Sequence, residues 1–224
     1  LSSIANGISE AKNLLMSEDV MAAIDAIKRL GIKVKFYKNS CKIYGKGING
    51  YKYKKNLVIN ARNSGTLGRL IPGLLINSNN PIKLIGDKSL SKRDFSRVTM
   101  PLKLFGANVK SKNNSLPINI QGTEYLRPIN YLEERGSAQC KSSVMLAALN
   151  TPGITKIKAK KSRNHTELLF KYLKIPIKLK STKNYDLIEV TGLKQFDAFD
   201  YIIPGDISSS AFFIVLTILS ENSK

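Results

Sequence analysis

Asn63-Ser64-Gly65-Thr66-Leu67 opens a segment in which the polar residues come first and the remainder, as far as residue 76, is mostly apolar. The same design occurs twice more, after Ser137-Ala138-Gln139 and after Asp206-Ile207-Ser208. The three starts lie about 70 residues apart, a period typical of a repeated supersecondary unit. Helices that are apolar on most sides pack inside a domain. The repeat therefore predicts buried helices that recur along the chain.

A second series of segments alternates with the first. Each begins near a serine that could act as an N-cap, then shows apolar residues at helical spacing and a strand-like continuation. The serines are Ser17, Ser91 and Ser162. Because both series share one period, each unit reads strand, buried helix, strand, amphipathic helix and two strands. The sequence thus predicts an α/β fold of three βαβαββ units.

The polar residues of the buried-helix series gather at the helix starts. Free backbone N–H groups and the helix dipole favour anions at such positions. We therefore expect a common anion-binding site where these helices begin.

The repeat is incomplete at both ends of the sequence. Residues 1–5 read as the tail of a buried helix without its polar start, and no strand follows the third apolar segment before Lys224. We expect a fragment: a three-unit domain over residues 1–203, with its first unit truncated, and the beginning of a second domain over 204–224.

The charge is strongly basic, with a formal net charge of +20 and no acidic residue between Ala26 and Gly86. Such a field attracts nucleic acid or phosphorylated metabolites. Compositional drift that leaves solvated lysine faces is the favoured explanation, ahead of small anions and then nucleic acid. Lysines alternate with apolar residues over 33–44, as in an exposed strand pair.

Other classes of protein find little support in the sequence. Cys41 and Cys140 form no metal or disulfide spacing. No apolar run reaches the roughly 20 residues of a membrane span, and the first residues do not resemble a signal peptide. We therefore expect an intracellular protein without a metal and without a membrane partner.

Five motifs resemble, in order, those of the 5-enolpyruvylshikimate-3-phosphate synthase family of enolpyruvyl transferases. They are Asn63 to Arg69, Gly86 to Arg93, Gly136 to Ser142, Ser162 to Glu167 and Pro204 to Phe213. The resemblance covers nearly the whole chain. It implies transfer of the enolpyruvyl group of phosphoenolpyruvate to the 5-hydroxyl of shikimate 3-phosphate, with release of phosphate.

The resemblance also implies two similar domains, each of three βαβαββ units with parallel buried helices, of which this chain holds one. The reaction belongs to the shikimate pathway of chorismate and aromatic amino-acid biosynthesis. The family needs no cofactor or nucleic acid, and the complete protein is expected to be a cytoplasmic monomer.

The matching positions carry the family's ligand contacts, by resemblance. Phosphoenolpyruvate would contact Gly65, Arg93, Gln139 and Asn63. Shikimate 3-phosphate would contact Ser137, Ala138, Gln139, Ser162 and Arg163. Arg69, Lys141 and Asp206 would line the cleft.

The residue types suit these roles. A glycine allows close approach of a backbone to a ligand, and a guanidinium binds oxyanions bidentately. Serine hydroxyls and helix N–H groups are neutral phosphate donors. The alternatives stay open at each position: a helix-start turn at Gly65, N-caps at the serines, a solvated Lys141 and a packing role for Arg69 and Asp206.

The sequence also departs from the family. Arg62, Asp94 and Asn164 replace the usual Gly, Pro and Asp. The N-terminal Lys-Ser…Arg motif, the catalytic Asp and the distal Glu and Arg have no counterpart, so no catalytic residue is identifiable. We expect the chain alone to be inactive. The alternatives are a related transferase acting on a UDP-sugar, against which residues 162–167 argue, and a non-enzymatic anion- or RNA-binding module.

Overall fold

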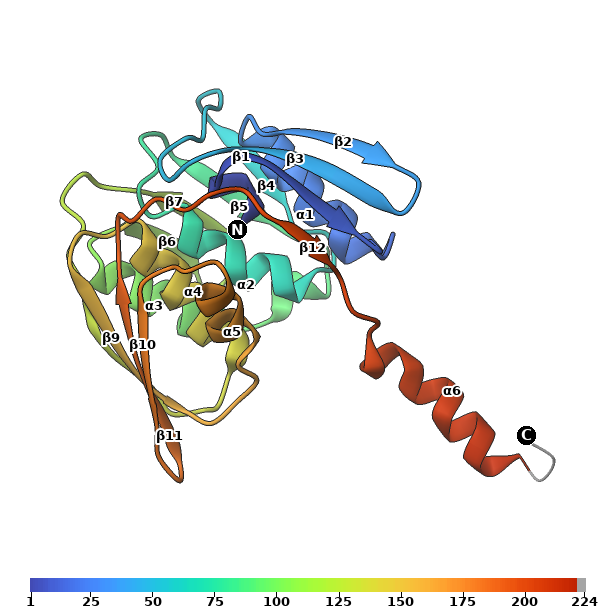
Figure 1. Cartoon of the computed structure of the whole chain (residues 1–224). Helices are drawn as coiled ribbons and strands as arrows, with labels where there is room; N and C mark the ends of the chain where they lie inside the picture. The colour runs from blue at the N-terminus through green and yellow to red at the C-terminus, as the bar shows by residue number, and fades with distance from the viewer. Residues whose placement is uncertain (221–224) are drawn as a thin grey trace.

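The computed structural model describes residues 1–220 and has three four-stranded sheets around central helices (Figure 1). Two of the repeat units are complete. The first of these comprises β4 (Leu57–Asn60), α2 (Gly65–Leu74), β5 (Ile82–Ile85), α3 (Ser96–Leu104), β6 (Asn108–Lys112) and β7 (Ser115–Gln121). The other comprises β8 (Asn130–Glu133), α4 (Ala138–Leu149), β9 (Ile154–Lys160), α5 (His165–Tyr172), β10 (Ile177–Ser181) and β11 (Tyr185–Thr191).

These two units have the same topology. Their sheets run β4-β5-β7-β6 and β8-β9-β11-β10. In both, the first two strands pair in parallel and the remaining pairs are antiparallel. The order of strand, buried helix, strand, amphipathic helix and two strands is therefore confirmed.

The remaining sheet is assembled from both ends of the chain. It runs β12-β1-β3-β2, from β1 (Asn6–Lys12), β2 (Lys33–Tyr37), β3 (Ser40–Lys46) and β12 (Asp200–Ile202). Helix α1 (Glu18–Arg29) connects β1 to β2. Strand β12 pairs in parallel with β1 and so takes the place that β4 and β8 hold in their sheets. Asn13 Nδ2 also donates to the carbonyl of Ile203 at 2.7 Å.

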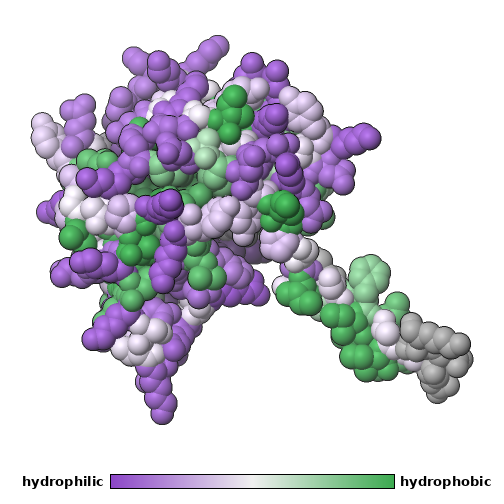
Figure 2. Space-filling view, in the orientation of Figure 1, coloured by the Kyte–Doolittle hydropathy of each residue, from purple (hydrophilic) through white to green (hydrophobic). Residues whose placement is uncertain are grey.

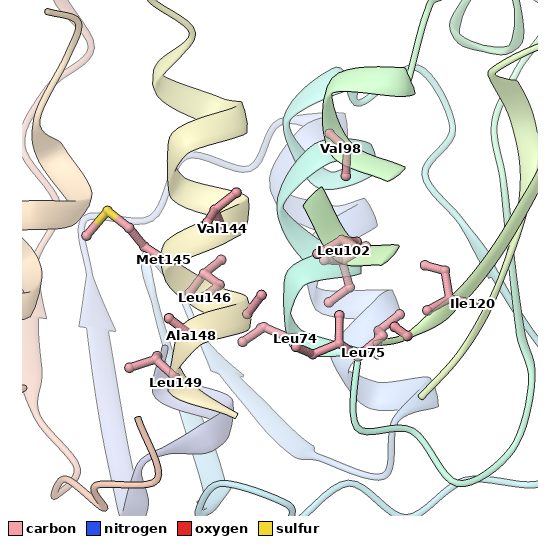
Figure 3. Packing of buried hydrophobic residues seen from close by; sticks show 14 of the residues in the cluster. Leu74, Leu75, Val98, Leu102, Ile120, Val144, Met145, Leu146, Ala148 and Leu149 are labelled. Atoms are coloured by element: carbon pink, nitrogen blue, oxygen red, sulfur yellow. The ribbon is translucent and has the colours of Figure 1, made fainter. Parts of the chain in front are cut away.

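Helices α2 and α4 form the centre of the molecule and run parallel. Near their starts, Arg69 donates to the Gln139 side chain at 3.0 Å. Near their ends, Asn77 Nδ2 donates to Asn150 Oδ1 at 3.2 Å. Between these contacts the backbones are so close that a Cβ on Gly73 would lie 2.2 Å from the Ser143 carbonyl oxygen. Every residue of α4 from 140 to 149 is buried, and Figure 3 shows some of them, among them Val144 and Leu146, in the hydrophobic cluster. The prediction of two buried helices side by side is confirmed.

Within the described residues, the first repeat unit has no long buried helix to match α2 and α4. Before β1 it has only the 3₁₀ turn η1 (Ser2–Ile4), in which Ser3 and Ile4 are buried. Beside it is an open groove of about 350 Å³, lined mainly by apolar side chains of α1, α2 and α4 such as Ala23, Leu67 and Leu146.

Helix α6 (Ile207–Leu219) corrects one sequence-based expectation. Its apolar sequence predicts a buried helix, but it projects away from the rest of the molecule (Figure 1). Its large side chains are exposed, with 82% of Phe212 and 76% of Leu219 accessible. The space-filling view shows this helix as an apolar projection from a largely polar body (Figure 2). Residues 221–224 lie outside the described part.

Of the three serines proposed as caps of the amphipathic helices, only Ser17 serves in that way. Its hydroxyl accepts from the Val20 amide at 3.4 Å. Ser91 lies in a 3₁₀ turn, and α3 starts later, where Asp94 accepts from the Ser96 amide at 2.7 Å. Helix α5 begins after Asn164, not at Ser162. In the buried-helix series, Ser64, Ser137 and Asp206 each accept a backbone N–H of their helix.

The basic segment forms the expected exposed strand pair. Strands β2 and β3 pair antiparallel, and the side chains of β2 alternate between exposed and half-buried. Lysine ammonium groups lie over rings of this region, at 5.1 Å for Lys33 over Tyr44 and 5.6 Å for Lys42 over Tyr37. Within residues 1–220, no helix combines the length and apolar character needed to cross a membrane.

Candidate functional site

The starts of α2 and α4 meet at one edge of the helix layer. Arg69 lies one turn into α2 and its Nη1 donates to Gln139 Oε1 of α4 at 3.0 Å. The amide nitrogen of Gln139 donates in return to Thr66 Oγ1 at 3.0 Å. Two helix N-termini, whose free N–H groups favour anions, are therefore linked by three side chains.

Gly65 lies between two guanidinium groups. A Cβ at this position would lie 2.8 Å from Arg69 Nη1 and 3.0 Å from Arg93 Nη1. Arg69 Nη1 also donates to the Gly65 carbonyl oxygen at 3.2 Å. The absence of a side chain at residue 65 thus allows two cationic groups to approach the first turn of α2, where they and a ligand oxyanion could meet.

Arg69 is further held by a ring. Its guanidinium carbon lies 5.7 Å from the centroid of the Phe95 ring, which is fully buried. A guanidinium over an aromatic face gains electrostatic attraction and loses side-chain freedom. Arg69 is consequently a fixed charge, whereas Arg93 is exposed.

Asn63 occupies the loop before α2 and contacts the loop that carries Arg93. Its Nδ2 donates to Asp87 Oδ2 at 2.5 Å. The Leu90 amide donates to the other carboxylate oxygen at 2.7 Å. These two bonds, the Leu90 amide foremost and then Asn63, lower the pKa of Asp87, and Arg93 adds a smaller Coulombic contribution in the same direction. The two loops are thereby connected by a charged acceptor.

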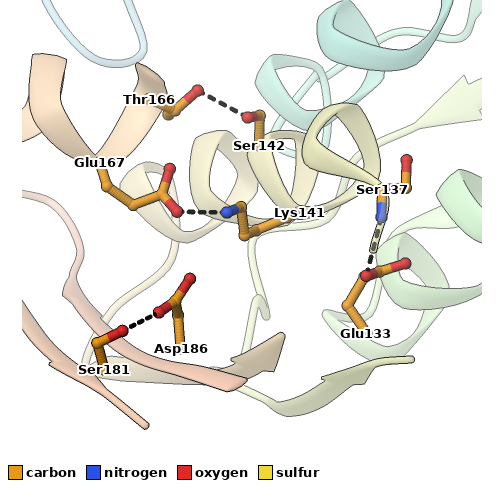
Figure 4. Close-up of polar contacts among 8 residues, drawn as sticks. All are labelled: Glu133, Ser137, Lys141, Ser142, Thr166, Glu167, Ser181 and Asp186. Atoms are coloured by element: carbon orange, nitrogen blue, oxygen red, sulfur yellow. Dashed lines mark hydrogen bonds and ion pairs between the residues drawn. The ribbon is translucent and has the colours of Figure 1, made fainter. Parts of the chain in front are cut away.

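The first turn of α4 is shaped by a buried carboxylate. Ser137 caps the helix, its hydroxyl accepting from the Cys140 amide at 3.3 Å. Behind it, Glu133 at the end of β8 accepts from the amides of Ser137 at 3.0 Å and Arg135 at 3.3 Å. Glu133 thus fixes the loop that leads into residues 137–139 (Figure 4).

The segment before α5 lies next to this loop. A Cβ on Gly136 would lie 3.4 Å from the carbonyl oxygen of Lys161. The following residue, Ser162, has a buried hydroxyl with no hydrogen-bond partner among residues 1–220. Arg163 is exposed beside it. The structure therefore brings the Ser137 and Ser162 segments together, as a shared ligand site requires.

One of the residues expected to line the cleft is buried instead. Lys141 is fully buried between α4 and α5, with its ammonium 2.5 Å from Glu167 Oε1, so it does not line an open surface. The spacing could not show this, because a lysine one turn into a helix is usually solvated. Asp206 is exposed at the start of α6, where it accepts from the Ser208 amide at 2.9 Å.

The Arg62 departure has a simple structural account. Its backbone adopts a positive φ of 53°, which explains the glycine usual at this position. Its guanidinium donates to Asp25 of α1 at 2.6 Å. Arg62 is therefore turned toward α1 by an ion pair.

Several residues of this site escaped sequence reasoning. Thr66 and Asp87 lay within recognised motifs, but nothing in the spacing marked them as partners of Gln139 and Asn63. Phe95 and Glu133 lay outside the recognised motifs. Only the tertiary contacts reveal them.

The arrangement suits binding of two oxyanions. Guanidinium groups and helix starts surround Gly65 and Gln139, and neutral donors with an adjacent arginine surround Ser137 and Ser162. Within the described residues, His, Cys, Asp and Glu side chains form no group of three that could hold a metal ion.

Comparison with known proteins identifies relatives of this architecture. Residues 1–223 match the family model described as EPSP synthase (3-phosphoshikimate 1-carboxyvinyltransferase). A 3-phosphoshikimate 1-carboxyvinyltransferase from Vesicomyosocius okutanii is 42% identical over 217 residues, which are 96% of this chain and 48% of that protein. One from Streptococcus mutans is 36% identical over 225 residues, 99% of this chain and 52% of that protein.

A solved structure gives the same result for the fold. The EPSP synthase of Acinetobacter baumannii matches with a TM-score of 0.87 and 31% identity, over 98% of this chain and 49% of that chain. The chain thus spans about half the length of the relatives that it matches.

Proposed function

Because the chain belongs to the EPSP synthase family, we propose that residues 1–203 form one substrate-binding domain of an enolpyruvyl transferase. The reaction transfers the enolpyruvyl group of phosphoenolpyruvate to the 5-hydroxyl of shikimate 3-phosphate and releases phosphate. The observation that carries the proposal is the meeting of two helix starts through Arg69 and Gln139, beside a glycine flanked by two guanidinium groups.

Phosphoenolpyruvate occupies the α2 side of this site. Arg93 binds its carboxylate or phosphate, because a guanidinium offers two parallel donors to a planar oxyanion. Gly65 lets the ligand reach the α2 backbone. Gln139 and Asn63 add neutral donors. Arg69, which contacts both Gly65 and Gln139, holds these elements in register.

Shikimate 3-phosphate occupies the α4 side. The start of α4 presents Ser137, Ala138 and Gln139, and the buried hydroxyl of Ser162 has no hydrogen-bond partner among residues 1–220. Such a group gains a partner when a phosphate binds. Arg163 contributes charge. Gln139 lies between the two ligands and is the residue that both share.

The proposal also concerns the boundary between two domains. Helix α6 extends from residue 207 away from the body, and its apolar side chains are exposed (Figure 2). We propose that residues 204–224 belong to a second domain, while β12 belongs to the first because it completes the β1 sheet.

The chemistry needs more than this domain supplies. A proton must reach the methylene carbon of phosphoenolpyruvate and another must leave the acceptor hydroxyl, which calls for general acid–base groups. The residues named here orient and neutralise the two anions. We therefore expect no turnover by the 224-residue chain; phosphate release above a buffer blank would contradict this.

Binding of shikimate 3-phosphate tests the proposal directly. Calorimetric or NMR titration of the chain, at two salt concentrations, is expected to show weak binding without phosphoenolpyruvate. Ser137→Ala is expected to weaken it by about 1 kcal/mol if one hydrogen bond is lost, and by more if that bond is charge-assisted.

Two control variants separate the possible causes. Ser64→Ala removes the equivalent cap of α2, which accepts from Leu67 at 3.1 Å, without removing a proposed shikimate 3-phosphate contact. A triple change of Lys52, Lys54 and Lys55 to Gln tests the basic stretch, whose long-range effect salt should screen. If the triple variant abolishes binding and Ser137→Ala does nothing, the site is misplaced.

The same titration distinguishes the alternatives. A UDP-sugar that binds while shikimate 3-phosphate does not would favour the related transferase. Salt-dependent binding of RNA, with no binding of either metabolite, would favour the non-enzymatic module.

A further inference from the structure

A buried ion pair connects the first turns of α4 and α5. Lys141 Nζ lies 2.5 Å from Glu167 Oε1, and the two side chains are 0% and 3% exposed (Figure 4). Beyond this contact, neither charged group has a hydrogen-bond partner among residues 1–220. Next to this pair, between Ser142, which follows Lys141, and Thr166, which precedes Glu167, the distance from Ser142 Oγ to Thr166 Oγ1 is 2.6 Å.

Stability alone does not account for such a pair. Removing a lysine and a glutamate from water costs several kcal/mol per ion, and their attraction often repays no more than that. Apolar side chains of similar volume at such positions are commonly neutral or stabilising. A charged pair without further hydrogen bonds therefore contributes little to stability. It does require that these two side chains, and no others, lie against each other, because an unpaired buried charge is costly.

The pair lies between two segments that have to be placed relative to each other. Lys141 follows the Ser137 cap by one helical turn, and its amide donates to the Ser137 carbonyl oxygen at 3.0 Å. Glu167 is in the first turn of α5, shortly after Ser162 and Arg163. These are the two halves of the proposed shikimate 3-phosphate site.

Glu167 also borders a cavity that Lys141 does not line. The cavity is about 250 Å³ in volume and is lined by polar groups that include Lys171, Lys180 and Asp186. The Glu167 carboxylate nevertheless lies against Lys141, and its side chain is only 3% exposed. The observed pairing with Lys141 selects one arrangement of α5 against α4.

We propose that the Lys141–Glu167 ion pair, with the adjacent Ser142–Thr166 hydrogen bond, is a positioning device that sets the Ser162 segment against the Ser137 segment. The inference rests on the proposed function for its ligand. Lys141 and Glu167 would not contact the substrate; they would act by fixing the positions of Ser137 and Ser162.

The test replaces the pair without leaving an unpaired charge. In the double variant Lys141→Met/Glu167→Leu, the volume is kept and the free energy of unfolding should be unchanged or higher. Amide hydrogen exchange over residues 138–142 and 163–167 should nevertheless become about tenfold faster, a size typical of coupled neighbours. Shikimate 3-phosphate should bind about tenfold more weakly.

Control variants exclude a general effect on folding. Ser143→Ala alters a buried hydroxyl of the same helix that takes part in neither the ion pair nor the hydrogen bond to α5, and it should change neither local exchange nor affinity. Single variants such as Lys141→Met leave a buried charge and are expected to unfold more easily; Glu167→Leu added to Lys141→Met should restore stability but not affinity.

The outcomes separate this inference from the proposed function. If the double variant exchanges and binds like the wild type, the inference is wrong. If the wild type does not bind shikimate 3-phosphate, the proposed function fails for this chain. Hydrogen exchange in the ligand-free protein still decides whether the pair positions the two segments.

Discussion

Helices α4 and α6 share one sequence design and have opposite environments. Each follows a strand, β8 before α4 and β12 before α6, after a connection of four residues, 134–137 or 203–206. Each begins at a polar cap. Each continues with mostly apolar residues. Yet residues 140–149 of α4 are buried, whereas the large side chains of α6 are exposed. Local pattern therefore specifies that a helix can be buried, and the surrounding chain decides whether it is.

The largest expected contrast comes from the same substitution in both helices. Val144 of α4 is 0% exposed and Val215 of α6 is 53% exposed. Val144→Asp places an unpaired carboxylate in the core and should destabilise the fold by about 4 kcal/mol or more. Val215→Asp should leave the free energy of unfolding unchanged and improve solubility. Chemical denaturation measures both, and equal losses would show that α6 is packed in solution.

A smaller contrast is expected at two glycines. A Cβ at Gly73 would meet the Ser143 carbonyl oxygen, whereas nothing lies within 4 Å of a Cβ at Gly205, before α6. Gly73→Ala should therefore force α2 and α4 apart and cost about 1–3 kcal/mol. Gly205→Ala serves as the matched control and should be near neutral by the same denaturation measurement. A neutral Gly73→Ala would mean that the two helices are less closely packed than described.

The smallest contrast concerns the helix caps. Ser137→Ala removes an acceptor for the Cys140 amide in a helix held on all sides, and should lower global stability by about 1 kcal/mol. Asp206→Ala removes the acceptor for the Ser208 amide in a projecting helix, so it should reduce only local helicity. Amide exchange of α6 and the unfolding midpoint distinguish the two effects. A lowered midpoint for Asp206→Ala would contradict the separation of α6 from the body.

The first unit shows where the sequence pattern is insufficient. The repeat predicted the strands and helices of the second and third units, because their periodicity is local and the elements are consecutive. It did not predict that β12 pairs with β1, with Glu10 opposite Asp200. Such pairing depends on how the whole chain returns to its start, and a strand of three residues has almost no pattern of its own.

The candidate site, too, was predicted from the sequence only in part. By resemblance to the family motifs, the sequence marked Gly65, Arg93, Ser137 and Ser162 as ligand contacts. In the structure Gly65 and Ser137 lie at helix starts, whereas Arg93 and Ser162 lie in the segments that precede α3 and α5. The repeat, the buried helices α2 and α4 and the family therefore follow from the amino-acid sequence.

The tertiary structure alone decided which helix starts meet, through Arg69 and Gln139, and that Lys141 is buried against Glu167. It also decided that α6 lies outside the core. The physical reason is that periodicity records which faces avoid water, whereas the partner of each face depends on contacts between residues far apart in the chain.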